Sequence, residues 1–149
     1  MKVTIIKSFL IIISSIFYVI VGIKHFIEPE YFLSIVPPYL PYHLELVYIS
    51  GLFEILFGLL ILFPKYRYYG AIGLILLLIA VFPANIYLFL SEIPRETLNI
   101  SKNQALIRLP FQIPLIILAY WHSKKSETKT LSIISSILFF PTIIYFITI

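Results

Sequence analysis

Cysteine is absent from the 149-residue sequence. The chain therefore offers no thiol for dithiol exchange, for a thiolate metal site or for nucleophilic attack. Charged residues are also scarce, at 12% against about 25% in soluble proteins. Of the 5 glycines, none falls in a phosphate-cradling loop. The sequence also lacks the motifs of P-loop and dinucleotide-binding proteins, zinc hydrolases, serine hydrolases and kinases, so none of these classes is indicated.

Apolar residues, in contrast, are abundant and fall in long runs, with 60% hydrophobic residues and a mean hydropathy of +1.02. A transmembrane helix needs about 20 apolar residues. The runs predict five spanning helices, at residues 4–23, 46–63, 68–90, 105–121 and 130–149. The expected fold class is all-α, a polytopic membrane protein with one domain (1–149), in which a four-helix transmembrane bundle is followed by a fifth C-terminal transmembrane helix. That last helix carries no charge and is expected to be peripheral and lipid-facing.

The first apolar run is expected to remain in the protein, because it is long and no Ala-x-Ala-like cleavage site follows it. Residues 24–45, between the first two runs, are rich in aromatic residues and proline. Pro37, Pro38 and Pro41 prevent a regular helix there, and aromatic side chains settle at the membrane–water interface. One interpretation is a short interfacial helix and then a rigid turn, packed over one end of the bundle. The other is an aromatic loop that rests on lipid headgroups.

The distribution of Lys and Arg predicts the orientation in the membrane. Seven of the 11 lie near the N-terminus, in the link between the second and third helices, or in the link between the fourth and fifth; the other four lie on the opposite side. The N-terminus is therefore expected to be cytoplasmic, in the plasma (inner) membrane, with the C-terminus outside. Basic loops of this kind report orientation, so the expected partner is the lipid bilayer and not nucleic acid.

A carboxylate, Glu54, lies within the second apolar run. On insertion scales a carboxylate at the bilayer centre costs about 2.5–3.5 kcal/mol, so it needs a protein or water environment. Ser50, Glu54 and Gly58 are spaced four residues apart and share one helix face, and a glycine lets another helix approach closely. This face is expected to point into the bundle. Arg108 is the expected counter-charge of Glu54, because a buried charge needs a partner.

Depth along each expected helix places the intramembrane polar groups at one level, in the outer half of the bundle beneath residues 24–45. The predicted polar cluster consists of His25, Ser50, Glu54, Asn85, Arg108 and Gln112. Pro83 is expected to leave the carbonyl of Ile79 without its usual donor. Three roles stay open for the cluster: a set of hydrogen bonds that keeps the helices in register, a pocket that handles a ligand or protons, and a metal site. No metal ligand is assigned, because His25, His43 and His122 show no paired metal spacing.

Five segments together resemble the DoxX-like family of small membrane proteins. They are His25–Pro29 (HFIEP), Val36–Pro41 (VPPYLP), Leu46–Gly51 (LVYISG) with Glu54 and Gly58, Ala80–Asn85 (AVFPAN), and Arg108–Gln112 (RLPFQ). Their order and spacing carry the resemblance over about residues 8–122. The resemblance implies a four-helix membrane bundle similar to MauE proteins, in a family named after a subunit linked to a thiosulfate:quinone oxidoreductase. The chain departs from the family by its fifth helix and by its lack of cysteine.

The resemblance implies a redox-associated or accessory role; catalysis by this chain is the less favoured alternative, and no catalytic residue is assigned. In that role the polar cluster touches a quinone, since an apolar pocket with a few converging polar groups suits a quinone headgroup. The implied partner is a membrane oxidoreductase or another membrane protein. Two alternatives stay open. One is a non-catalytic assembly or chaperone module, and the other is a small-molecule carrier, which would have to oligomerise because no inverted repeat is detectable.

Overall fold

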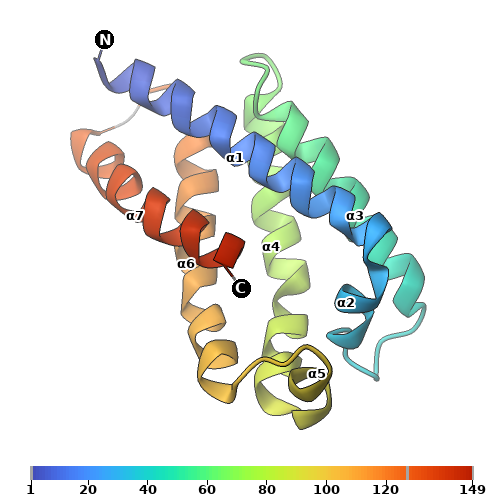
Figure 1. Ribbon diagram of the computed structural model, residues 1–149. Coiled ribbons are helices and arrows are strands. Elements are labelled where there is room, and N and C mark those ends of the chain that lie inside the picture. The colour runs from blue at the N-terminus through green and yellow to red at the C-terminus, as the bar shows by residue number, and fades with distance from the viewer. Residues whose placement is uncertain (1, 127, 149) are drawn as a thin grey trace.

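The computed structural model describes residues 2–126 and 128–148, and within these ranges the chain is helical with no strand. The helices are α1 (Lys2–Ile27), α2 (Pro29–Ser34), α3 (His43–Leu60), α4 (Arg67–Leu90), α5 (Glu92–Thr97), α6 (Lys102–Ser123) and α7 (Lys129–Thr148). Except for the short α2 and α5, each is long and apolar enough to cross a membrane. The predicted fold class, an all-α polytopic membrane protein, is confirmed (Figure 1).

The helix boundaries differ from the predicted ones by a few residues, because polar residues extend the apolar runs. Helix α1 continues to Ile27, with basic residues in its last turn, where they interact favourably with the helix dipole. Helix α3 begins at His43 and ends at Leu60, earlier than predicted at both ends. Helix α6 begins at Lys102, because the side chains of Ser101 and Gln104 form a capping box with each other's backbone N–H.

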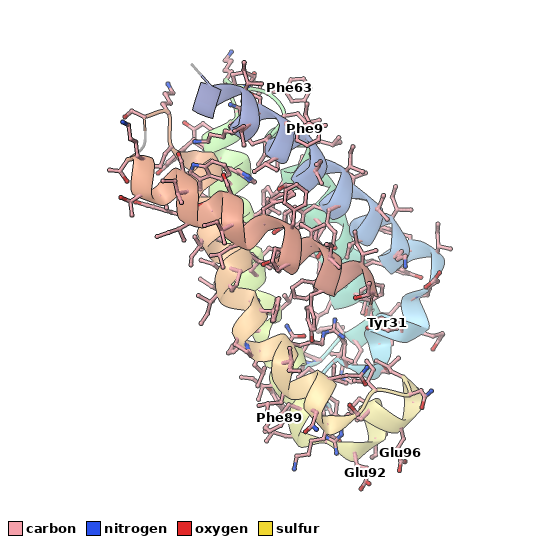
Figure 2. All side chains as sticks on the ribbon, turned by 60° about the vertical axis from the view of Figure 1, so that its left-hand side comes forward. Phe9, Tyr31, Phe63, Phe89, Glu92 and Glu96 are labelled. Carbon is pink, nitrogen blue, oxygen red and sulfur yellow. The ribbon has the colours of Figure 1, made fainter. Side chains whose placement is uncertain are left out.

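Four of the five spanning helices are arranged as two pairs. Helix α1 packs along α3, and α4 packs along α6. A tight turn at residues 61–66 joins α3 to α4 and marks the turn end of the bundle. From there the two pairs diverge toward the other end, where α2 and α5 lie (Figure 1). This is the cap end; Figure 2 shows Glu92 and Glu96 of α5 there, far from Phe63 at the turn end.

Helix α7 packs against α6 and α1, so only one of its sides is free to face lipid (Figure 2). Its other side buries Ser132, Ser135 and Thr142 together with Phe139 and Ile143. The expectation of a peripheral, lipid-facing helix therefore fits its exposed side and does not hold for this buried side. Small hydroxyl side chains let membrane helices pack closely, which explains why serine and threonine lie on the side of α7 that contacts α6 and α1.

The segment between α1 and α3, residues 28–42, is the cap. It contains α2, which begins with Pro29 at the first helical position, where proline is favoured. After α2, a turn follows in which the N–H of Leu40 donates to the carbonyl of Pro37. The predicted short helix followed by a turn is confirmed. The alternative of a loop resting on headgroups is wrong for Phe32, which stacks on the ring of His25 with 3.5 Å between ring centroids.

Candidate functional site

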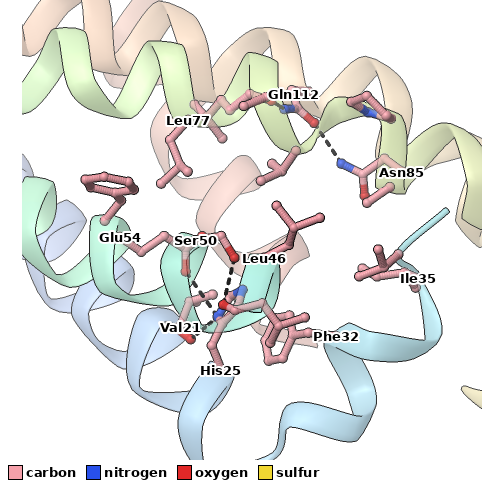
Figure 3. A pocket seen from close by; sticks show the side chains of 18 of the residues that line it. Val21, His25, Phe32, Ile35, Leu46, Ser50, Glu54, Leu77, Asn85 and Gln112 are labelled. Atoms are coloured by element: carbon pink, nitrogen blue, oxygen red, sulfur yellow. Dashed lines mark hydrogen bonds and ion pairs between the residues drawn. The ribbon is translucent and has the colours of Figure 1, made fainter. Parts of the chain in front are cut away.

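A cavity of about 380 Å³ lies between the two helix pairs, bordered by the cap (Figure 3). The residues that line it include the whole predicted polar cluster: His25, Ser50, Glu54, Asn85, Arg108 and Gln112. Most of the remaining lining is apolar, from Leu, Val, Ile, Phe, Pro and Ala side chains. The structure thus brings together six side chains from four helices. Their role in binding a ligand stays a prediction.

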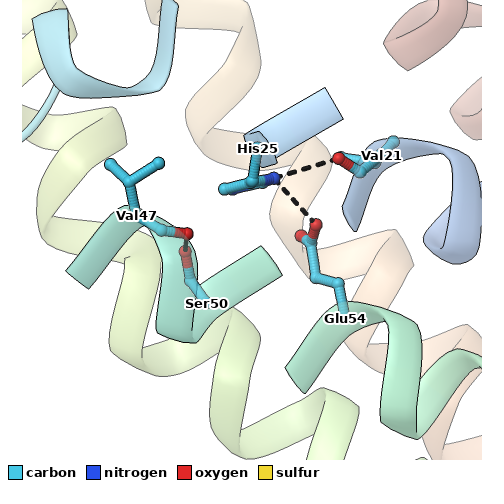
Figure 4. A network of polar contacts seen from close by, with 5 residues as sticks. All are labelled: Val21, His25, Val47, Ser50 and Glu54. Carbon is cyan, nitrogen blue, oxygen red and sulfur yellow. Dashed lines mark hydrogen bonds and ion pairs between the residues drawn. The ribbon is translucent and has the colours of Figure 1, made fainter. Parts of the chain in front are cut away.

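His25 and Glu54 face each other across the α1–α3 contact (Figure 4). The Nδ1 atom of His25 lies 3.4 Å from Oε2 of Glu54 and 3.0 Å from the carbonyl oxygen of Val21. Because a carbonyl only accepts, Nδ1 carries the hydrogen and donates to Val21. Gly51 permits this arrangement, since a Cβ atom there would lie 2.5 Å from Cβ of His25. The absent side chain of Gly51 therefore sets the distance between α1 and α3 beside the pocket.

The predicted ion pair between Glu54 and Arg108 is wrong. Within the described residues, Oε2 of Glu54 lies 3.4 Å from Nδ1 of His25, and Nη1 of Arg108 donates to the hydroxyl oxygen of Tyr31 at 3.0 Å. The reason is the divergence of the two pairs: Glu54 belongs to α3 and Arg108 to α6, and α2 of the cap lies closer to the guanidinium. No sequence signal pairs Tyr31 with Arg108, because aromatic residues in this segment are expected at a membrane interface.

Asn85 and Gln112 connect α4 to α6 directly. Nδ2 of Asn85 donates to Oε1 of Gln112 at 2.8 Å (Figure 3). Nε2 of Gln112 donates in turn to the backbone carbonyl of Leu78. The accepting carbonyl belongs to Leu78, in the helical turn that precedes Pro83. It lies one residue before Ile79, whose carbonyl was expected to lack its usual donor. These two amides hold the α4–α6 pair in register, as the structural interpretation of the cluster requires.

Among the described residues, two ionisable side chains in the pocket keep buried polar atoms without a hydrogen bond, although one of these atoms, Oε2 of Glu54, lies 3.4 Å from Nδ1 of His25. These atoms are Oε2 of Glu54, whose side chain is 15% exposed, and Nε of Arg108. Leaving a buried polar atom unpaired costs about 1–3 kcal/mol, and more when the group is charged. Ser50, in contrast, donates its hydroxyl to the carbonyl of Val47 within its own helix. The lining of the pocket therefore includes a carboxyl group on α3 and a guanidinium on α6 whose hydrogen-bonding capacity is only partly used within the protein.

The pocket is better suited to an organic molecule than to a metal ion. His25 and Glu54 are the metal-binding residue types in its lining, and no group of three His, Cys, Asp or Glu side chains gathers anywhere in residues 2–126 and 128–148. A bound organic molecule would contact the apolar walls and place polar atoms near Glu54 and Arg108. Small-molecule sites in proteins commonly combine apolar walls with a few placed polar groups.

The fold and the pocket define a small polytopic membrane protein with an internal, partly polar cavity. The chain belongs to the family described as "Domain of unknown function (DUF8561)", whose model matches residues 14–123. The matched region includes all six residues of the predicted polar cluster and ends before α7. No curated protein and no solved structure matches the chain. The resemblance to the DoxX-like family stays a prediction.

Proposed function

We propose that the protein binds a lipid-soluble molecule with a hydrogen-bonding headgroup, of which a quinone is the best example, and that it serves as an accessory subunit of a membrane redox system. The observation that carries the proposal is the cavity itself: its walls are mainly apolar, yet Glu54 and Arg108 line it and each keeps a buried atom without a hydrogen bond. A ligand that pairs both atoms removes the free-energy cost of leaving them unpaired.

The chemistry of a quinone matches these two groups. A quinone carbonyl accepts a hydrogen bond, which the guanidinium of Arg108 can donate, and a quinol hydroxyl donates one, which the carboxylate of Glu54 can accept. The flat ring is apolar on both faces and fits between side chains such as Val21, Leu78 and Leu115, which line the cavity. Both oxidation states of the headgroup therefore find a partner in the same pocket.

The redox assignment rests on the sequence resemblance to DoxX-like proteins, and the orientation rests on the basic residues. The start of α1, the turn at residues 61–66 and the link between α6 and α7 lie at the turn end (Figure 1). Because positively charged loops favour the cytoplasmic side, we propose that the turn end is cytoplasmic. In a plasma (inner) membrane the pocket then lies nearer the outer surface.

The test is to purify the protein from its own membranes in mild detergent and to extract it with organic solvent. Liquid chromatography with mass spectrometry is expected to detect quinone in the wild-type extract. Glu54→Gln keeps the side-chain size but removes the charged acceptor, so bound quinone is expected to fall about tenfold. Glu45→Gln is the matched control, because Glu45 lies on the same helix but is exposed and outside the cavity lining, and its quinone content should equal that of wild type.

An absence of quinone in the wild-type extract, together with no binding of added quinone in lipid nanodiscs, would count against the proposal. Co-purification of an oxidoreductase is the expected second result, since an accessory subunit stays with its complex. If a partner protein is captured equally by wild type and by Glu54→Gln while no quinone is found in either, the protein is an assembly module and the quinone proposal is wrong.

A further inference from the structure

The two helix pairs are tightly closed along their own lengths. In the α1–α3 pair, a Cβ atom at Gly22 would lie 2.6 Å from the carbonyl oxygen of Gly51, so the two backbones touch at the level of the pocket. In the α4–α6 pair, the hydrogen bonds of Asn85 and Gln112 close the contact at the same level. A molecule cannot enter the cavity between the helices of either pair without breaking these contacts.

The contact between α3 and α4, in contrast, is tight only near the turn end. A Cβ atom at Gly70 would lie 2.8 Å from Cβ of Leu60, and one at Gly73 would lie 2.5 Å from the ring of Phe57. One helical turn further, Phe53 and Leu77 both line the cavity. The cavity therefore begins where the two helices stop touching, and Figure 3 shows α3 and α4 on its opposite sides.

Several residues of the cavity lining are also exposed on the molecular surface. On α3, Leu46, Ile49 and Phe53 line the cavity with 38%, 50% and 40% of their surface exposed, and on α4 Ala80 does the same. These four residues define the α3–α4 gap. They lie within two membrane-spanning helices, so the surface they form faces acyl chains and not water.

The other sides of the cavity are covered. At the cap end, Ile35 and Pro37 line the cavity and are themselves buried. On the side of α1 and α6, Phe146 of α7 lines the cavity and packs near Phe17, with 6.4 Å between ring centroids. The exposed part of the lining is thus concentrated on the side between α3 and α4.

We propose that the ligand enters this pocket sideways from the bilayer, through the α3–α4 gap, and that it is an amphiphile whose apolar chain lies in the gap while its headgroup reaches Glu54 and Arg108. The contact of the headgroup with Glu54 and Arg108 rests on the proposed function. The entry route and the position of the ligand's apolar chain are inferred from the exposed residues of the cavity lining. Because each buried methylene contributes favourably, a chain-bearing ligand binds more tightly than its headgroup alone.

The test compares two probes in nanodiscs that hold the full chain: decylubiquinone, and the same ring without its tail, 2,3-dimethoxy-5-methyl-1,4-benzoquinone. Decylubiquinone is expected to bind at least about tenfold more tightly. A version with a photoreactive group at the end of the tail is expected to label peptides that contain residues 46–53 and 77–84. Labelling of residues 28–42 in their place, or equal binding of both probes, would overturn the sideways route.

Two substitutions obstruct the gap without touching the polar groups. Ile49→Trp and Ala80→Trp are each expected to slow decylubiquinone association about tenfold. Leu52→Trp and Leu76→Trp are the matched controls, because both residues are exposed on the same helices but lie outside the cavity lining. Unchanged association in Ile49→Trp and Ala80→Trp would overturn the route. Failure of both probes to bind wild type is a different result, which contradicts the proposed function itself.

Discussion

The two ends of the bundle use buried polar side chains in different ways. At the turn end, Nζ of Lys7 donates to the carbonyl of Lys124 at 2.8 Å, and Nε of Arg67 donates to the carbonyl of Ile61 at 2.8 Å. These carbonyls lie at helix C-termini, where the backbone lacks intrahelical donors. At the cap end, Glu54 and Arg108 instead face a cavity and keep unpaired atoms. Basic residues bind the carbonyls at helix C-termini at both ends, since Arg95 of α5 donates to the carbonyls of Phe89 and Ser91 at the end of α4. The difference is that at the cap end charged side chains also line a cavity.

Each end also carries a buried histidine. His25 lines the cavity, stacks on Phe32 and donates to Val21. His122 is almost fully buried and does not line the cavity, and within the described part of the chain neither of its ring nitrogens has a hydrogen-bond partner. Burial and a polar atom without a hydrogen bond therefore do not by themselves define a binding site. What distinguishes the cap end is the cavity beside the unpaired atoms, where the two helix pairs diverge.

The largest expected effect on stability comes from a substitution at the α1–α3 contact beside the pocket. Gly51→Ala places a methyl group 2.5 Å from Cβ of His25, and overpacking of this kind costs about 1–3 kcal/mol. Gly58→Ala is the matched control on the same helix, because its nearest contact, Cβ of Tyr18, would be 3.0 Å away. Thermal unfolding in detergent should show a clearly lower Tm for Gly51→Ala than for Gly58→Ala. Equal Tm values would contradict the idea that Gly51 sets the α1–α3 distance.

At the turn end, Arg67→Met removes the donors to the carbonyls of Ile61 and Leu62. We expect a loss of about 1–2 kcal/mol in unfolding free energy, since Arg67 is only half-buried. Quinone binding should not change, because Arg67 is outside the cavity lining. Lys65→Met, an exposed neighbour, is the control and should match wild type in both measurements. A loss of binding in Arg67→Met at unchanged stability would erase the contrast between the two ends.

Within the cap end, Asn85 and Gln112 are expected to be structural. Asn85→Leu and Gln112→Leu should each lower the free energy of unfolding by about 1 kcal/mol, because each leaves its partner unpaired. The double variant should lose less than the sum, since no unpaired amide then remains at this contact. Denaturant titrations of the four proteins give the coupling. Strict additivity would show that the 2.8 Å hydrogen bond between them contributes nothing.

For Glu54 the expectation is opposite. Glu54→Leu should leave the unfolding free energy within about 1 kcal/mol of wild type, because it removes a buried oxygen that has no hydrogen bond, while Nδ1 of His25 keeps its bond to the carbonyl of Val21. Binding of quinone should be lost, because the acceptor is gone. Asn85→Leu provides the comparison, since it should lower stability instead. A large loss of stability in Glu54→Leu would favour the interpretation that Glu54 only holds helices in register.

The smallest perturbation tests the orientation. Because the chain has no cysteine, a single introduced cysteine is the only thiol that a maleimide can label. Tyr39→Cys in the cap and Lys65→Cys in the turn replace exposed residues at opposite ends, so neither should affect folding. A membrane-impermeant maleimide is expected to label Tyr39→Cys in intact cells, and to label Lys65→Cys only after the membrane is opened. The reverse pattern would place the turn end outside.

The five spans could be predicted from the sequence because a bilayer demands long apolar runs, and such runs are visible in one dimension. The first residue of each helix was harder to predict from the sequence. The start of α6 at Lys102 has a readable signal, Ser101 with Gln104 three residues on, but the apolar run itself begins only at Ala105. The start of α3 has no such signal, because the residue before it, Tyr42, forms no side-chain cap. Its backbone adopts a left-handed conformation with φ of 56°, which is uncommon for tyrosine.

The level of the polar cluster was also predictable, whereas its pairings were not. Depth along a helix follows from counting residues at 1.5 Å each, and this placed six residues on one cavity. The partner of a side chain depends on how far apart two helices lie and on what the cap inserts between them. For that reason the expected partner of Glu54 was Arg108, while the structure pairs Arg108 with Tyr31.

Hydropathy and helical rise act locally along the chain, so an all-α membrane protein with a charged group in its second span can be predicted from the residues alone. That α1–α3 and α4–α6 close as pairs while α3 and α4 separate depends on contacts between distant segments. The physical reason is that glycine contacts and amide hydrogen bonds act between segments distant in sequence, and their positions set where helices touch. That separation creates both the cavity and its opening toward the lipid.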